Sequence, residues 1–320
     1  RIARWADAHG FAETAIQYAE AAAVICPDEA RLANLCGRLT RNAADHARAE
    51  VWFERGIGLA RARRDWVEYT RGHLGAGILA LGRGREGRAR RHFNTASSIA
   101  MREGHEWLAA EAQHDLFQFM TVRGNYVDAE VHARRALAWY PKHHPRLPFL
   151  AADVAFLLVC QRHHAPAAEI LRLFVRTIQP PQNVLGYSLL VRALAGVGNR
   201  REFERRRARL LKLLAEHTEY EAAARWNLAQ GELAAGEGDA ALANARMAVE
   251  LARARRDRET EVLAERLVAE LEAGADAPAQ PRRREERFRD FVGTLLSRLG
   301  EWSPTRRGRS PSLSRAEWAA

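Results

Sequence analysis

The chain has 320 residues, of which 47% are hydrophobic and 28% are charged, a balance typical of a folded protein rather than of a disordered or collagen-like one. No apolar run approaches the roughly 18 residues that a membrane-spanning helix needs, which excludes a transmembrane class. The three cysteines, Cys26, Cys36 and Cys160, form neither a CxxC pair nor a metal-ligand set, so we expect no disulfide framework and a reducing, cytoplasmic setting. Because the first residue is Arg1 rather than Met, we expect that the natural start, with any leader, lies outside the chain.

The net charge of +10 comes from arginine, because only two of the 50 basic residues are lysines. Residues 282–315 hold ten arginines against four carboxylates, a net charge of +6 that leaves +4 for the rest of the chain. The densest basic run of the body extends from Arg200 to Lys212 and has seven cations against two glutamates. A patch for nucleic acid or for an acidic protein competes there with a plain solvated helix face. We favour the solvated face, so nucleic acid is not expected as a partner.

Helical patterns fill the chain from its start to about residue 273, because Ala, Leu, Arg and Glu dominate and apolar residues recur at spacings of three and four. Short breaks rich in Gly, Pro, Asn and Asp separate segments of ~12–18 residues, which is typical of helical hairpins. The breaks fall at residues 9–10, 26–28, 42–45, 63–65, 82–85, 123–125, 140–141, 180–181, 198–199 and 236–239.

An internal repeat appears when the small residue in the middle of each second helix is aligned. The aligned alanines follow one another at steps of 34, 40, 40 and 38 residues: Ala15, Ala49, Ala89, Ala129 and Ala167. Seven residues further on, four of the five positions are again small: Ala22, Gly56, Ala96 and Ala136, with Phe174 as the exception. Two helices can approach closely only where both present Gly or Ala. We therefore expect Gly37 and Gly77 to mark the contact on the first helices, with Phe53 and Phe93 filling the space beside it.

At these residues the chain resembles the tetratricopeptide repeat (TPR) family. The pattern is carried by Gly37, Ala49, Phe53 and Gly56, by Gly10, Ala15, Ala22 and Pro27, and by the later set Ala241, Ala245 and Ala248. The resemblance implies an all-α fold, a right-handed α-solenoid of about seven stacked helical hairpins over residues 1–273, closed by a capping helix at 259–272. The unit at 183–216 is the weak one, because Phe203 stands where a small residue belongs. The alternative is an irregular helical bundle with accidental alanine periodicity.

Beyond the solenoid we expect a linker at 274–284, a separate amphipathic helix at 285–300 and a disordered basic tail at 301–320. The helix carries a single apolar stripe: Phe288, Phe291, Val292, Leu295, Leu296 and Leu299. A stripe of this size must be buried on the solenoid, against a second copy or on an anionic membrane. We favour docking in cis or a homodimer over the membrane, because Glu285, Glu286 and Asp290 dilute the basic face.

No pattern for catalysis or cofactor binding is present. The glycines at 82–87 follow a helix rather than a strand, so they do not form a phosphate loop. The pairs His143–His144 and His163–His164 are adjacent residues, which point about 100° apart on a helix and cannot chelate a metal as a pair. We therefore expect no enzyme activity, no cofactor and no metal site.

The remaining functional surface is the groove. In a solenoid the first helix of each hairpin lines the concave side, which can hold a peptide or a partner helix. By the resemblance, the groove residues would be Arg31, Asn34, Arg38 and Arg41 in the second unit, His114, Asp115 and Gln118 in the fourth, and Trp226, Asn227 and Gln230 in the seventh. The arginines suit an acidic ligand, whereas the lysines of the chaperone-binding relatives are missing.

The sequence thus predicts a non-catalytic scaffold that binds a protein or peptide partner, with an acidic segment favoured. The alternative is the helical sensory or regulatory region of a larger signalling or transcriptional regulator whose effector domain lies outside this chain.

Overall fold

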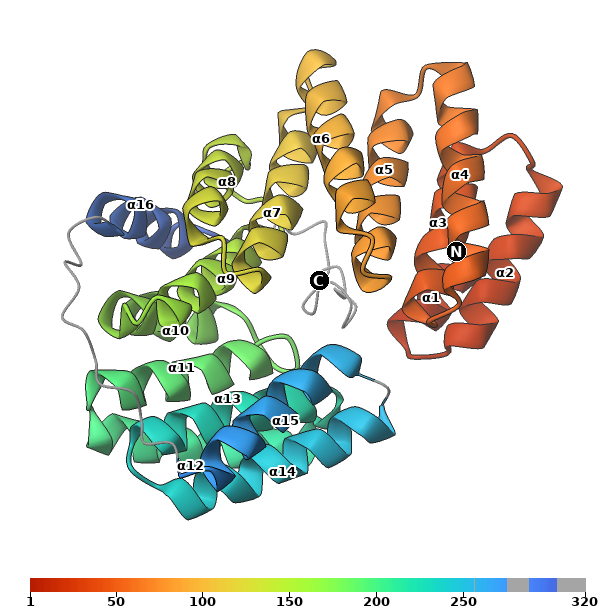
Figure 1. The fold of residues 1–320 in the computed structure, drawn as a ribbon. Coiled ribbons are helices and arrows are strands. Elements are labelled where there is room, and N and C mark those ends of the chain that lie inside the picture. Colours follow the sequence, from red (N-terminus) through yellow and green to blue (C-terminus); the bar gives the residue numbers. More distant parts are fainter. Residues whose placement is uncertain (256, 275–287, 304–320) are drawn as a thin grey trace. The chain divides into compact units, whose positions relative to one another are not determined.

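The computed structural model describes residues 1–255, 257–274 and 288–303, and within them all regular secondary structure is helical (Figure 1). The first group of helices comprises α1 (Ile2–Ala8), α2 (Ala12–Ile25), α3 (Ala30–Asn42), α4 (His46–Arg63), α5 (Trp66–Gly82), α6 (Glu86–Arg102), α7 (Glu106–Val122) and α8 (Tyr126–Trp139). The second group comprises α9 (Leu147–Cys160), α10 (His164–Thr177), α11 (Val184–Val197), α12 (Arg200–Glu216), the 3₁₀ turn η1 (Thr218–Tyr220), α13 (Glu221–Ala234), α14 (Gly238–Ala254), α15 (Arg258–Glu272) and α16 (Arg289–Gly300). None of these helices is both long and apolar enough to cross a membrane.

Polar caps and glycines set the helix ends at the predicted breaks. The side chains of Asp45, Asp65 and Asn125 each accept a hydrogen bond from the backbone N–H three residues on, at the starts of α4, α5 and α8. In the turn before α8, Gly124 has a φ of +71°, a conformation that costs glycine no steric energy.

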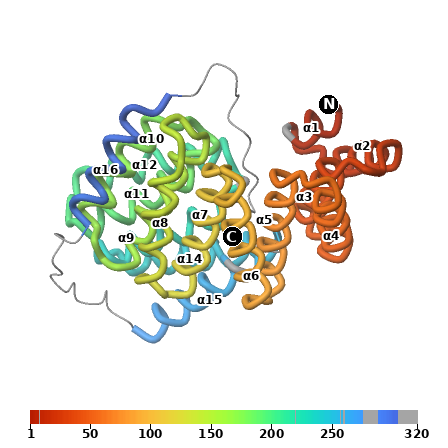
Figure 2. Tube along the Cα trace, turned by 90° about the horizontal axis from the view of Figure 1, so that it is seen from above, coloured from red at the N-terminus to blue at the C-terminus, as the bar shows by residue number. Residues whose placement is uncertain are grey.

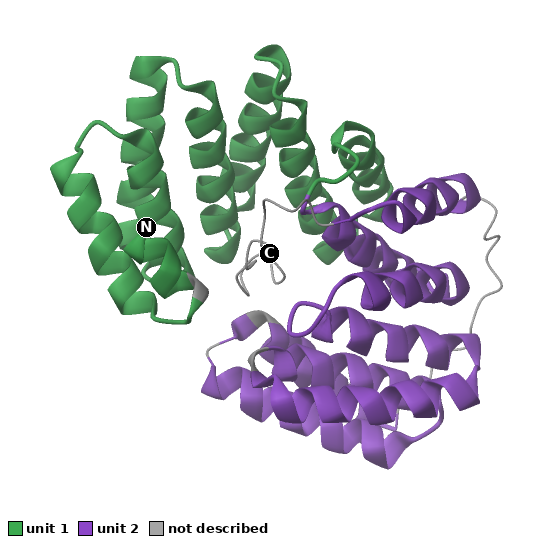
Figure 3. Ribbon diagram, turned by 180° about the vertical axis from the view of Figure 1, so that it is seen from behind, with its two compact units in different colours: residues 1–144, 310–320 green, residues 145–309 purple. Residues whose placement is uncertain are grey.

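The helices pack in chain order as hairpins, which confirms the predicted all-α solenoid of stacked hairpins. The described residues fall into two compact units, 1–144 and 145 onward (Figure 3). Unit 1 holds the hairpins α1/α2, α3/α4, α5/α6 and α7/α8, and unit 2 holds α9/α10, α11/α12, α13/α14 and the single helix α15. The sequence pattern, which we interpreted as one array over 1–273, does not indicate this division. The predicted linker and basic tail lie almost entirely outside the described residues.

Close contacts of phenylalanine with glycine hold the hairpins together. A Cβ at Gly37 would lie 2.8 Å from the Phe53 ring, and one at Gly75, on the next first helix, would lie 2.2 Å from it. Phe93 lies in the same way against Gly77. The other predicted packing residues are fully buried or nearly so: Ala15, Ala49, Gly56, Ala89, Ala96, Ala129, Ala136, Ala241 and Ala248. Ala22 is the exception, because it is only half-buried and the buried positions beside it are Ala19 and Ala23.

The weak repeat at 183–216 forms the hairpin α11/α12. Phe203, at its small-residue position, is fully buried. A Cβ at Gly231 of α13 would lie 3.1 Å from the Cα atom of Arg192 and 3.6 Å from the Phe203 ring. Gly231 therefore allows α13 to approach the backbone of α11 closely, and the Phe203 ring is in ordinary contact beside it.

The C-terminal amphipathic helix is present as α16, and it packs against α10 and α9 within unit 2 (Figures 1 and 2). Most of the predicted stripe is buried: Phe288, Phe291, Val292, Leu295 and Leu299. The helix is thus docked in cis. Residues 285–287 of the predicted helix lie outside the described part of the chain.

Candidate partner-binding surfaces

The predicted groove residues of α3 are mostly engaged within unit 1. Buried Asn34 donates from Nδ2 to the backbone carbonyl of Glu68 at 2.8 Å and to its Oε2 at 3.0 Å. Arg38 forms an ion pair with Asp7 at 2.9 Å, and Arg41 is 8% exposed and donates to Asn42. Arg31 alone of this set is exposed.

The predicted residues of α7 lie deeper still. His114 and Asp115 are buried, and the Nδ1 atom of His114 lies 3.1 Å from the hydroxyl of Tyr140. Gln118 is half-buried. His114 thus contacts the end of the α7/α8 hairpin, and the buried His114 and Asp115 do not form an open ligand surface.

In unit 2 the predicted residues of α13 contact α11. Asn227 donates to the hydroxyl of Ser188 at 3.2 Å and accepts a hydrogen bond from Arg192 at 3.3 Å. The same guanidinium lies over the Trp226 ring, 5.1 Å from its centroid. Gln230 is half-buried. Consecutive first helices are therefore joined by polar contacts on the side where a groove was predicted.

Unit 1 has a matching contact that sequence reasoning missed. Arg71 donates to Glu68 at 2.7 Å and lies over the ring of Trp107, 5.6 Å from its centroid. Its side chain is still 45% exposed. Arg71 follows Arg31 by 40 residues, the same step that separates Gly37 from Gly77. Arg31 and Arg71 therefore occupy equivalent positions of consecutive first helices, and this step is the signal that could have identified Arg71.

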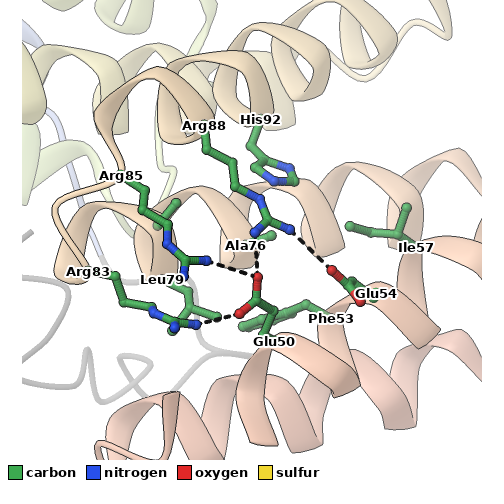
Figure 4. A pocket seen from close by; sticks show the side chains of 11 residues that line it. Glu50, Phe53, Glu54, Ile57, Ala76, Leu79, Arg83, Arg85, Arg88 and His92 are labelled. Carbon is green, nitrogen blue, oxygen red and sulfur yellow. Dashed lines mark hydrogen bonds and ion pairs between the residues drawn. The ribbon is translucent and has the colours of Figure 1, made fainter. Parts of the chain in front are cut away.

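A cluster of ion pairs joins α4 to the turn between α5 and α6 (Figure 4). The Glu50 carboxylate pairs with Arg83, Arg85 and Arg88, and Arg88 also reaches Glu54 at 3.1 Å. Burial alone would raise the pKa of the Glu50 carboxyl, but the three guanidinium groups, led by Arg88, lower it below its usual value. The cavity beside the cluster has only about 30 Å³. It is large enough for a water molecule and too small for a ligand. The cluster is therefore a set of ion pairs that connects two hairpins.

Similar ion pairs with glutamates neutralise many of the other arginines. In unit 2, Arg172 pairs with Glu202 at 2.7 Å, and Arg200 and Arg207 both pair with Glu237 of the next hairpin. The basic run of α12 is therefore partly neutralised. Its outward ridge remains exposed: Arg201, Arg205, Arg209 and Lys212.

Two partly buried polar pairs recur at one register in unit 1. His73 and His92 meet through their Nδ1 atoms at 3.0 Å, and 40 residues later Gln113 and His132 meet at 2.8 Å. Burial and then the neighbouring His92 together lower the pKa of His73 to about 4. The pKa of His92 is lowered as well, by burial first and then by Arg88 and Arg91. Among the described residues, no group of three or more His, Cys, Asp or Glu side chains is placed to hold a metal ion.

A hollow of about 730 Å³ lies between α1, α2 and α3. Apolar side chains line it, among them Ile2, Tyr18 and Ile25, together with Arg4 and Arg31. We do not assign this hollow a ligand.

Searches against known proteins give no further indication of function, because no family model matches the chain and no curated protein matches it.

Proposed function

We propose that the chain is a non-catalytic scaffold of the tetratricopeptide type, which binds an acidic segment of a partner protein along the first helices of unit 1. The observation that carries the proposal is the pair Arg31 and Arg71, two exposed arginines at the same position of consecutive first helices. Guanidinium groups bind carboxylates with two parallel hydrogen bonds where their orientation is fixed. Contacts with Glu68 and with the Trp107 ring restrict the orientation of Arg71.

The other predicted groove residues support this narrower site. Asn34, His114, Asp115 and Asn227 are buried, and Asn34, His114 and Asn227 contact other parts of their own unit, so these residues do not contribute to recognition in this proposal. A cytoplasmic location, which the cysteine content favours, belongs to the same proposal. The alternative, a regulatory region of a larger protein, is compatible with the same binding surface, and the full reading frame would decide it.

The test is binding to an array of 15-residue peptides of graded net charge. The parent chain should retain the acidic peptides, and the variant Arg31→Glu with Arg71→Glu should lose at least ~10-fold in affinity, because two close ion pairs become repulsive contacts. The matched control is Arg61→Glu with Arg90→Glu, which makes the same charge change on the exposed faces of the second helices of these two hairpins. Equal binding by the two variants, or no preference for acidic peptides in the parent, would refute the site.

A further inference from the structure

The short amphipathic helix α16 covers a surface of the α9/α10 hairpin, the α16 seat. α16 lies beside α10 and α9 in both views (Figures 1 and 2). Five side chains of its stripe are at most 4% exposed: Phe288, Phe291, Val292, Leu295 and Leu299. Thr294 and Ser297, on the opposite face, are exposed. The stripe has the spacing i, i+3, i+4, i+7 and i+11, with which a helix lies in an apolar groove of a binding partner.

One of the two helices under α16, α9, is apolar and must be covered by other helices. Eleven of the 14 residues of α9 are buried, and a helix that is apolar on nearly all sides must be covered on all of them. His163, the residue before α10, is 4% exposed, and its ring meets the Phe288 ring edge-on with 4.9 Å between centroids. Because this surface binds the apolar stripe of α16, the ligand that suits it is an amphipathic helix with an apolar stripe.

The connection of α16 to the array makes it comparable to a tethered ligand. α15 ends at Glu272 and α16 begins at Arg289, on a hairpin that precedes α15 by about 100 residues. α16 has 12 residues, and isolated helices of this length are marginal in water, so its helical structure depends on docking. A tethered segment competes with an outside helix mainly through its effective concentration. A partner helix with more contacts can therefore displace it.

We propose that the α9/α10 seat is a helix-binding groove, which α16 fills in the free chain and which an amphipathic helix of a partner protein fills in the complex. The partner helix carries apolar residues at the α16 spacing. This inference rests on the proposed scaffold function, in that the chain binds partner segments, but it assigns a second surface in unit 2 and a different ligand chemistry from the acidic segment at Arg31 and Arg71.

The experiment adds a labelled peptide of residues 285–303 to full-length chains. In one variant, Phe291→Asp and Leu295→Asp place charges on the buried face of α16 and so release the helix from its seat. In the matched control, Thr294→Asp and Ser297→Asp place the same charges on the exposed face. We expect the first variant to bind the peptide one to one. The control and the parent should bind it at least ~10-fold more weakly, because their own α16 fills the seat.

Circular dichroism shows whether each variant keeps its helical content. Should the double aspartate variant unfold, Leu299→Ala removes fewer contacts, and its affinity for the peptide must still exceed that of the parent. A folded variant with a released α16 that does not bind the peptide would overturn the proposal. So would a dimeric parent that becomes monomeric on Phe291→Asp with Leu295→Asp, because the seat would then be an interface between copies. Binding of acidic peptides is measured separately, so failure of the seat leaves the site at Arg31 and Arg71 untouched.

Discussion

The hairpins α5/α6 and α9/α10 each bury a phenylalanine of the second helix against a glycine, but they differ in how the rest of their surface is stabilised. Phe93 lies against Gly77 of its own hairpin, whereas Phe174 lies against Gly186 of α11, the first helix of the next hairpin. Beyond that contact, α5/α6 is rich in polar interactions, with the His73–His92 pair inside it and the Glu50 cluster at its edge.

In α9/α10 the first helix is almost entirely apolar, and α16 packs on both helices of the hairpin. Polar pairs specify a register but depend on pH and salt, whereas apolar burial is insensitive to both and requires a cover. Hairpins of the same repeat can therefore be stabilised by polar pairs or by apolar burial, and apolar burial requires an additional helix as a cover.

The largest effect should come from removing either of these buried phenylalanine rings. Phe93→Ala and Phe174→Ala each delete a fully buried ring, which typically costs about 3–5 kcal/mol of unfolding free energy. Denaturant unfolding, followed by hydrogen exchange in each unit, measures the loss where it occurs. Phe11→Ala is the control, because Phe11 is 54% exposed and its removal leaves no cavity. A loss below ~1 kcal/mol for either variant would mean that the ring at that position does not hold its helices together.

The pattern of small residues allowed the fold to be predicted further than the site. Close contact between helices explains why small residues such as Gly37, Gly77 and the alanines recur at steps of 34 to 40 residues. The groove residues were assigned by register alone, and register does not show whether a polar side chain such as Asn34 faces solvent or a neighbouring helix. That outcome depends on the residue 34 positions on, Glu68, whose carbonyl and carboxylate both accept from Asn34. The contact of α16 with α9/α10 could not be predicted from the sequence either, because the helix and the hairpin are more than 100 residues apart.

Acid should weaken α5/α6 through its histidine pair. In the folded chain the pKa of His73 is about 4, below its ordinary value of 6.5. The unfolded chain therefore binds more protons between these values, so stability is constant above pH 6.5 and falls as the pH drops toward 4. His73→Gln recreates the Gln113–His132 pair of the next hairpin and should flatten this fall. The measurement is the denaturation midpoint from pH 7 to pH 5.

Exposed His9 gives the control for this pH series, because His9→Gln removes an imidazole outside the hairpin and should leave the slope of the parent. An unchanged slope in His73→Gln would show that the buried pair is not the source of acid sensitivity.

The smallest effect should come from the ion-pair cluster. Glu50→Gln removes one carboxylate from three arginines, but such pairs near the surface typically contribute about 0–1 kcal/mol each. The loss should be visible in unfolding midpoints at low salt and should shrink toward 1 M salt, where the screening length falls to about 3 Å. Glu54→Gln, which removes a single pair with Arg88, should cost less than Glu50→Gln at every salt concentration. In α9/α10 the cost of Leu295→Ala should hardly change with salt, because Leu295 is fully buried and apolar. A salt-independent loss at Glu50 would mean that the carboxylate acts through packing, and the chemical difference between the two hairpins would then be smaller than their contacts suggest.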